Sequence, residues 1–213
     1  MDRLALRGAE IIATARLGEG GASSGKVGGG CLALDLSDEK SCRVFAKNLA
    51  GTEYRTVILL IGQMSIEDGS ELSGLSEVES YFSTFVARYC WVINEVIEHS
   101  KNDIRILHVS SRSSKYGSWD EYYAAAKAAI EVFLRSKSKK TGGRIGSLSI
   151  APSLIEGSGM LHSFEHEHIE SHRRRAGGTL LTLDDVAREI ERLSDSPDTL
   201  WDGRVVGLGP DYI

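Results

Sequence analysis

The sequence has few cysteines and prolines and lacks a long apolar run, and each shortage excludes a class of protein. Three cysteines and three prolines occur in 213 residues. Cys31, Cys42 and Cys90 are odd in number and show no Cys-x-x-Cys spacing, so they favour a reducing cytosol over a disulfide framework or a zinc site. No segment approaches the roughly 18 apolar residues of a membrane span, and the N-terminus lacks the apolar region of a signal peptide. We therefore expect a cytoplasmic protein with no membrane partner.

Positive charge is also in the minority, with 25 Lys and Arg against 30 Asp and Glu and a net charge of -5. This balance argues against a nucleic-acid partner. The local basic cluster at residues 173–175 is interpreted as a solvated helix end. No internal repeat or linker divides the chain, and its length suits one large core. We expect a single domain over residues 1–213.

Short apolar runs alternate with longer amphipathic stretches, which is typical of a parallel sheet covered by helices. The expected strands are residues 10–15, 31–36, 56–62, 104–110, 145–151 and 204–208. The expected helices are residues 1–7, 39–49, 76–100, 120–136 and 183–193, the last capped by Thr182 with Asp184 and Asp185 in its first turn. Residues 18–30 and 153–178 interrupt the alternation. Both should lie beyond the carboxyl ends of the strands, where such sheets place their sites.

The most specific chemical pattern is Ser110-Ser111 followed by Tyr123 and Lys127. Positions i and i+4 share one face of a helix, so the Lys127 ammonium should lie beside the Tyr123 phenol and lower its pKa. A tyrosine tuned in this way can exchange a proton with an alcohol or a carbonyl near neutral pH. The Ser111 hydroxyl would orient the substrate oxygen.

Two stretches around this pattern resemble the short-chain dehydrogenase/reductase family. Residues 106–133 (ILHVSSRSSKYGSWDEYYAAAKAAIEVF) look like its serine strand and tyrosine–lysine helix, and residues 144–160 (RIGSLSIAPSLIEGSGM) look like the next strand and turn. The resemblance implies a Rossmann-like three-layer α/β domain with a mostly parallel sheet and a substrate lid at about residues 153–178. It implies an NAD(P)(H)-dependent oxidoreductase acting on an alcohol or carbonyl. Tyr123 would be the acid/base, Lys127 would tune Tyr123 and hold the cofactor ribose, and Ser111 or Ser110 would orient the substrate.

The same resemblance implies which residues would contact NADP or NAD. They are Arg16, Asp35, Leu36, Gly62, Lys127, Pro152 and Ile155. Arg16 follows the expected strand at residues 10–15. At this place in the family a basic residue tends to meet the 2′-phosphate of NADP, and an acidic residue prefers NAD. The Asp35-Leu36 pair would flank the adenine, and Ile155 would pack on the amide side of the nicotinamide. The choice between the two cofactors stays open.

The sequence departs from the family most at its start, where the first strand and its Gly-x-x-x-Gly-x-Gly turn are absent, as in an N-terminally truncated member. Residues 20–28 (GGASSGKVG) are open to interpretation as a flexible connector, a rearranged phosphate loop or a P-loop, but no helix follows them. The absent strand would be central, so residues 10–15 should move inward against residues 56–62, or another chain should supply a strand. The family's asparagine at a kink in the long helix falls near Ser83 or Thr84.

These departures keep a second function open. The chain could be a non-catalytic family member with lost or weakened cofactor binding, acting as a scaffold or as the partner subunit of an active paralogue. If it is active, its partner is a small-molecule alcohol or carbonyl. The resemblance also implies a homo-oligomer (a dimer or tetramer) or a hetero-oligomer with a paralogue, formed through the central helix and the tyrosine–lysine helix.

Four histidines gather within the expected lid. His162/His166 and His168/His172 each have the i,i+4 spacing of a helical metal site, but the two pairs point to different faces. We favour a solvated lid helix whose histidines titrate at about pH 6–7 over a metal site. We therefore expect no metal.

Overall fold

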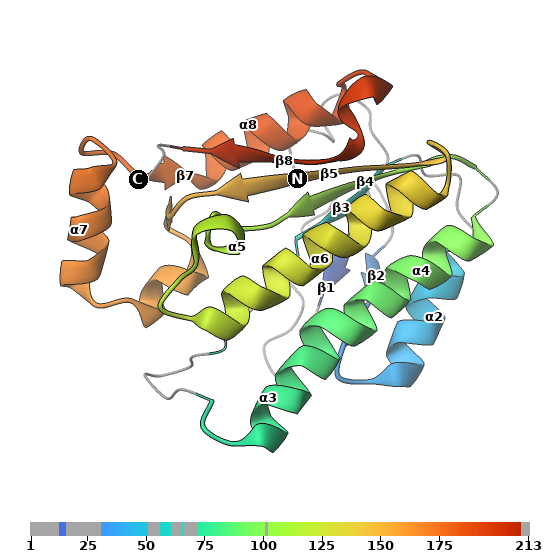
Figure 1. The fold of residues 1–213 in the computed structure, drawn as a ribbon, viewed down its shortest axis with the longest axis horizontal. Helices are drawn as coiled ribbons and strands as arrows, with labels where there is room; N and C mark the ends of the chain where they lie inside the picture. Colours follow the sequence, from blue (N-terminus) through green and yellow to red (C-terminus); the bar gives the residue numbers. More distant parts are fainter. Residues whose placement is uncertain are drawn as a thin grey trace.

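The computed structural model describes residues 13–15, 31–50, 56–60, 65, 72–100 and 102–209. A parallel sheet of four strands lies at its centre, in the order β3-β4-β5-β8. These strands are β3 (Thr56–Leu59), β4 (Ile104–Val109), β5 (Ile145–Pro152) and β8 (Asp202–Leu208). Helices cover both faces of the sheet (Figure 1), so the expected Rossmann-like α/β class is confirmed. Because both faces are covered, β5 is buried along its whole length.

One face of the sheet is covered by three helical segments. They are α2 (Glu39–Ala50), α6 (Glu121–Lys140) and a long segment made of α3 (Leu75–Phe82), the π-helix η1 (Ser83–Arg88) and α4 (Tyr89–His99). Helix α8 (Leu183–Ser194) covers the other face. No helix in the described parts of the chain is long and apolar enough to cross a membrane.

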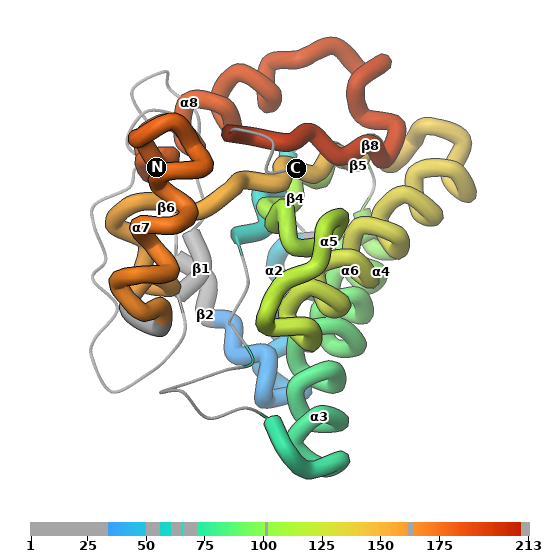
Figure 2. The backbone as a smooth tube through the Cα atoms, turned by 60° about the vertical axis from the view of Figure 1, so that its left-hand side comes forward, coloured from blue at the N-terminus to red at the C-terminus, as the bar shows by residue number. Residues whose placement is uncertain are grey.

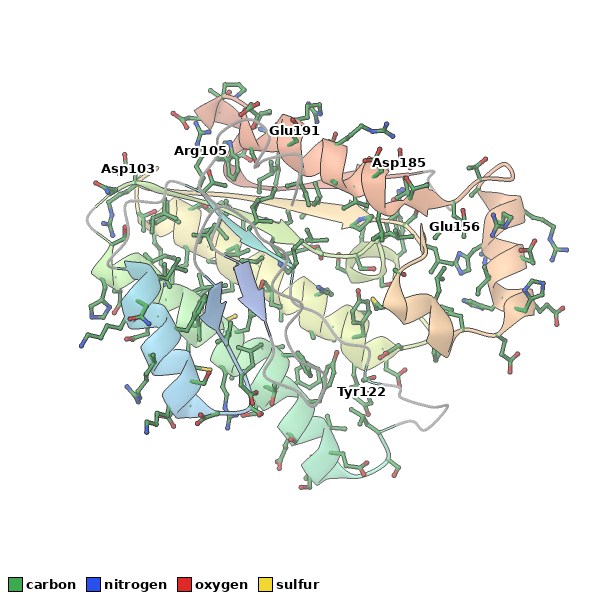
Figure 3. The ribbon with its side chains drawn as sticks, turned by 180° about the vertical axis from the view of Figure 1, so that it is seen from behind. Asp103, Arg105, Tyr122, Glu156, Asp185 and Glu191 are labelled. Carbon is green, nitrogen blue, oxygen red and sulfur yellow. The ribbon has the colours of Figure 1, made fainter. Side chains whose placement is uncertain are left out.

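The alternation of side chains along β4 fills both layers of the core. Ile104 and Ile106 pack with residues of α2, α4 and α6, whereas Leu107 packs with residues of α8. Arg105 also points to the α8 layer, where Glu191 lies (Figure 3), and its Nε donates to Asp198 Oδ1 at 3.0 Å. The sheet is therefore the middle of three layers.

The expected cap of α8 is present. The Thr182 hydroxyl accepts a hydrogen bond from the Asp185 amide at 3.1 Å, and the Asp185 carboxylate accepts one from the Thr182 amide at 2.8 Å. Hydrogen bonds from Thr182 lower the pKa of Asp185 to about 2. Helix α6 runs further than expected, to Lys140, and ends just before Gly142, whose φ of 61° is the left-handed conformation that favours glycine.

The first two strands form a separate block. β1 (Ala13–Ala15) pairs in parallel with β2 (Cys31–Ala33), and β3 pairs with β4. Among the described residues, β1 does not pair with β3, so the expected inward shift of residues 10–15 is wrong for this part of the chain. Helix packing joins the blocks instead, because Phe45 of α2 shares a core with α4 and Arg88 Nη1 donates to Leu36 O at 2.9 Å. The expected helix at residues 1–7 lies outside the described residues.

Short elements gather beyond the carboxyl ends of the sheet strands. They are α5 (Ser113–Tyr116), β6 (Ile155–Glu156), the 3₁₀ turn η2 (Gly159–Ser163), α7 (His166–Arg175) and β7 (Leu181–Thr182), while the 3₁₀ turn η3 (Asp198–Leu200) precedes β8 at the other end. Figures 1 and 2 show α7 (orange) standing off from the sheet on the side where β5 ends. Most of these elements belong to the segment expected to form the lid.

Candidate active site

Helix α6 begins at a buried carboxylate. Asp120 is only 1% exposed, and its side chain accepts a hydrogen bond from the Tyr123 amide at 2.9 Å. The same carboxylate accepts hydrogen bonds from the Ser65 amide, at 2.8 Å, and from the Ser65 hydroxyl. A carboxylate at a helix N-terminus satisfies amides that have no partner within the helix and meets the positive end of its dipole. Asp120 thereby fixes the turn that carries Tyr123.

Ser111 is held at the carboxyl end of β4. The Ser110 amide donates to Ile150 O at 2.7 Å and the Arg112 amide donates to Pro152 O at 3.1 Å, so the β4–β5 ladder continues past Ser111 on both sides. Burial raises the pKa of Tyr123, and the nearby Ser111 hydroxyl acts in the opposite direction. The Ser111 Oγ atom also accepts a hydrogen bond from the Ser113 amide at 3.2 Å. The strand end and the helix thus bring together the two hydroxyls that the sequence analysis paired.

Lys127 lies one turn beyond Tyr123 on the buried face of α6. Its Nζ is 5.6 Å from the centre of the Tyr123 ring and donates to Val109 O at 3.0 Å. Both side chains are buried. The i,i+4 spacing therefore produces the expected proximity, and the main chain at the end of β4 holds the ammonium in place.

A second buried carboxylate lies one turn further along the helix. Glu131 accepts hydrogen bonds from the Ser110 hydroxyl at 2.5 Å and from the Ser114 hydroxyl at 2.7 Å. Its charge raises the pKa of Lys127 against the effect of burial. Glu131 thus ties the segment that carries Ser111 to the helix that carries Tyr123 and Lys127.

Burial is the largest influence on the pKa values of Tyr123 and Lys127. It raises the pKa of Tyr123 to about 12, although the nearby Ser111 hydroxyl works in the opposite direction. It lowers the pKa of Lys127 to about 8, against the field of Glu131. The expected lowering of the Tyr123 pKa is therefore wrong, because burial, aided by the negative charge of Asp120, outweighs the effect of Ser111.

A cavity of about 480 Å³ opens in front of these residues. Ser111, Tyr123 and Lys127 line one side of it, and Pro152 and Ile155 line the wall that follows β5. Loop and lid residues close the rest, including Trp119, Phe164, His168 and His172. Residues predicted from two separate stretches of the sequence thus line a single cavity.

Comparison with solved structures identifies this arrangement of strands and helices. A short-chain dehydrogenase from Burkholderia cenocepacia in complex with NADP matches with a TM-score of 0.78 and 17% identity over 98% of this chain and 89% of that chain. A short-chain dehydrogenase/reductase from Serratia marcescens matches with a TM-score of 0.79 and 18% identity over 97% and 88%. The chain has the short-chain dehydrogenase/reductase fold.

Other structures with this fold include the angucycline C-6 ketoreductase LanV with bound NADP, at a TM-score of 0.69 and 19% identity over 84% of this chain and 73% of that chain. No family model matches the sequence, and no curated protein matches it. The likeness is therefore one of fold.

Within this fold the residues expected to hold a cofactor have different surroundings. Lys127, Pro152 and Ile155 line the cavity. Leu36 is buried in the core beside α4, and the Asp35 carboxylate accepts hydrogen bonds from the amide and hydroxyl of Ser37 at 2.8 and 2.6 Å. Arg16 and Gly62 lie outside the described residues, as does the whole of residues 20–28.

The long helix carries a backbone irregularity where the short-chain dehydrogenase/reductase resemblance implied a kink. Residues Ser83–Arg88 form a π-helix between α3 and α4. Such turns often accompany functional sites. Both Ser83 and Thr84 lie within it, so the irregularity is present without the asparagine.

The lid histidines divide between solvent and cavity. His166 is exposed, whereas His168 and His172 are partly buried and their Nε2 atoms lie 3.1 Å apart. Burial and the nearby Arg175 lower the pKa of both. Helix α7 is thus exposed to solvent at His166, as expected, but not on the face that carries His168 and His172. Among the described residues, no group of three or more His, Cys, Asp or Glu could hold a metal ion.

Three contributors to the site were not predicted from the sequence. Asp120 was placed at the start of a helix without a role, although an aspartate at that position is a capping signal. Glu131 follows Lys127 at i+4, which was a usable signal for an ion pair. Trp119 carried no signal, because its place in the cavity depends on the fold of the lid.

Proposed function

We propose that the protein is an NAD(P)H-dependent reductase that converts a carbonyl substrate to an alcohol. One observation carries the proposal: Ser111, Tyr123 and Lys127 line a single cavity at the carboxyl end of β4, with Pro152 and Ile155 on the adjoining wall. The similar structures described as a ketoreductase with bound NADP and a putative β-ketoacyl-ACP reductase support the reaction class.

In the proposed reaction, the substrate carbonyl oxygen accepts a hydrogen bond from the Ser111 hydroxyl and lies beside the Tyr123 phenol. A nicotinamide cofactor, when bound, supplies the hydride that adds to the carbonyl carbon. Tyr123 gives its phenolic proton to the oxygen as the C=O double bond becomes a single bond. The Lys127 ammonium, 5.6 Å from the centre of the Tyr123 ring, stabilises the phenolate that is left.

The protonation of Tyr123 favours reduction over oxidation. With a pKa raised to about 12, the phenol keeps its proton at neutral pH and is ready to act as an acid. Oxidation of an alcohol would need the phenolate, which is scarce under those conditions. The protonated phenol is the form that carbonyl reduction uses.

One end of the cavity fits a nicotinamide ring. The Ser153 hydroxyl lines the cavity and is buried, and it has no hydrogen-bond partner among the described residues. A buried hydroxyl of this kind gains a partner from a bound carboxamide group. Pro152 and Ile155 offer apolar surface beside it for the ring. We favour NADP over NAD because two of the similar structures contain NADP. Arg16 is the proposed contact of the 2′-phosphate.

Titration of the protein with NADPH and NADH, followed by cofactor fluorescence, tests binding, and NADPH oxidation with a panel of aldehydes and ketones tests turnover. Tyr123→Phe should lower turnover about 100- to 10,000-fold, the usual contribution of a general acid, and leave NADPH binding unchanged. Tyr122→Phe is the matched control, because Tyr122 packs against Phe82 with ring centres 6.2 Å apart, on the α3 side of α6 (Figure 3).

Two results would contradict the proposal. The first is full turnover by a folded Tyr123→Phe variant, which would remove the assigned acid. The second is the absence of saturable binding of either cofactor at millimolar concentration. The second result would favour the non-catalytic scaffold or partner subunit.

A further inference from the structure

The cavity is basic in an acidic protein. Its lining side chains that can carry a positive charge are Arg112, Lys127, His168, His172 and Arg175, and no Asp or Glu is among the described residues that line it. The whole chain has a net charge of -5, so this concentration of positive charge does not follow from composition. Low-dielectric walls focus such a field on whatever occupies the cavity.

Two of these cations donate hydrogen bonds to main-chain carbonyl groups. Arg112 donates to Gly209 O at 2.8 Å and stacks over Tyr116, and Lys127 donates to Val109 O at 3.0 Å. Both serve the frame of the site. The positive charge on the lid side of the cavity comes from Arg175, close enough to His168 and His172 that its field lowers the pKa of each.

The placement of Arg175 sets it apart from its neighbours on α7. Basic residues in the last turn of a helix complement the dipole, which would account for all three arginines there. Arg173, however, is paired with Glu156 and Glu170 at 3.0 and 3.1 Å. Arg174 is exposed, as Arg175 is, but it is not among the residues that line the cavity. Arg175 is the one of the three that lines the cavity.

A row of aromatic and imidazole rings connects α7 to the start of α6. The Trp119 and Phe164 rings meet edge to face with centres 5.3 Å apart, and the Phe164 and His168 rings stack with centres 5.1 Å apart. His168 and His172 follow with centres 4.6 Å apart. Trp119 is 41% exposed, although it lies four residues before Tyr123 and lines the cavity. An exposed indole at a cavity rim offers a face on which a planar ligand can stack.

We propose that this cavity takes carbonyl compounds in which a planar ring carries a carboxylate. The ring lies against Trp119 and Phe164, and the carboxylate lies at the α7 end, where Arg175 and the His168/His172 pair supply hydrogen-bond donors. The carbonyl group then points to Ser111 and Tyr123 at the opposite end. The term carbonyl rests on the proposed reductase function, whereas the preference for a carboxylate on a planar ring rests on the lining of the cavity.

The test uses para-acetylbenzoate and its uncharged methyl ester, with binding measured by calorimetry on the protein with and without NADPH. We expect the acid to bind roughly tenfold more tightly than the ester, which is the scale of one charge-assisted contact. Arg175→Gln should remove most of this preference. Arg174→Gln changes the net charge of α7 equally but lies outside the cavity, and it should keep the preference.

Three results would overturn the inference: equal binding of acid and ester, no binding of either, or equal loss of the preference in the two arginine variants. The last would show that the field of α7 as a whole, and not Arg175, attracts the anion. NADPH oxidation is followed separately. A clear preference for the acid, lost in Arg175→Gln, would support the inference even with no oxidation of NADPH. The absence of NADPH oxidation with every aldehyde and ketone of the panel would contradict the reductase function alone.

Discussion

At the scale of single residues, Lys127 is where charge, burial and the proposed chemistry meet. Its pKa is lowered to about 8, so the amine is protonated below that pH and neutral above it. The ammonium stabilises the Tyr123 phenolate only while it is charged. We therefore expect kcat for carbonyl reduction to fall as the pH rises through about 8 in a profile measured at saturating NADPH. A rate that stays flat far above that pH would contradict this role for Lys127.

Glu131 should set the position of that fall. Its negative charge raises the pKa of Lys127, so Glu131→Gln should lower it and move the alkaline limb of the pH–rate profile to lower pH. The glutamine can still accept hydrogen bonds from Ser110 and Ser114, which keeps the fold close to the original. Glu121→Gln is the control, because Glu121 is exposed in the first turn of the same helix. A profile that does not move in Glu131→Gln, or moves equally in both variants, would exclude a specific effect.

The sequence was sufficient to predict which of the proposed catalytic residues lie together but not how they are charged. The i,i+4 spacing of Tyr123 and Lys127 fixes their proximity on any helix. The sign of the Tyr123 pKa shift depends on how deeply α6 is buried, which is a property of the assembled fold. The partners of Glu131 are equally non-local, since Ser110 lies 21 residues away from it in the chain.

At the scale of elements, Asp120 should contribute to the stability of α6. Asp120→Ala removes a cap and leaves the Ser65 and Tyr123 amides without their acceptor, so we expect a loss of about 1–3 kcal/mol in the free energy of unfolding. Asp120→Asn keeps an acceptor oxygen and should cost less. Asp103→Ala, at an exposed loop position, should leave the midpoint of urea unfolding unchanged. Equal midpoints for Asp120→Ala and Asp103→Ala would contradict this role.

The packing of β8 on α6 gives a second test at this scale. Gly203 and Gly142 both have positive φ, 87° and 61°, but a Cβ at Gly203 would lie 2.7 Å from Arg135 Cα, while a Cβ at Gly142 would meet nothing within 4 Å. Gly142→Ala should cost only the backbone strain of about 1–2 kcal/mol. Gly203→Ala should cost a further 1–3 kcal/mol, roughly, because the strand must move away from the helix. Similar unfolding midpoints for the two variants would show that α6 and β8 separate easily.

At the scale of the whole molecule, the order of helices and strands followed from periodicity, and the pairing of strands did not. Apolar runs predict buried strands at residues 104–110 and 145–151. The pattern is apolar because β4 and β5 are covered on both faces. The separation of β1 and β2 from β3 could not be read from the sequence, because pairing depends on which edges the helices bring together. The same holds for the cavity, since α7 meets Trp119 only after the lid folds back.

An oligomer stays a prediction, implied by the resemblance and placed on the outer faces of α4 and α6. Val132 of α6 is 57% exposed and is the natural residue to test. If α6 lies in an interface, Val132→Glu should lower the mass measured by light scattering. Val44→Glu, on α2 at a similar exposure of 52%, should leave the mass unchanged. A monomeric parent protein would end this expectation.

The link between Asp120 and Ser65 joins residues 55 positions apart in the chain. The Ser65 amide, which donates to the Asp120 carboxylate, can exchange its proton with solvent only when this link opens. Its exchange rate in heavy water therefore reports how often the two distant segments separate. A ligand that orders the cavity should slow hydrogen exchange at this amide more than at the amides of α8. The exchange rate therefore reports ligand binding without a turnover assay.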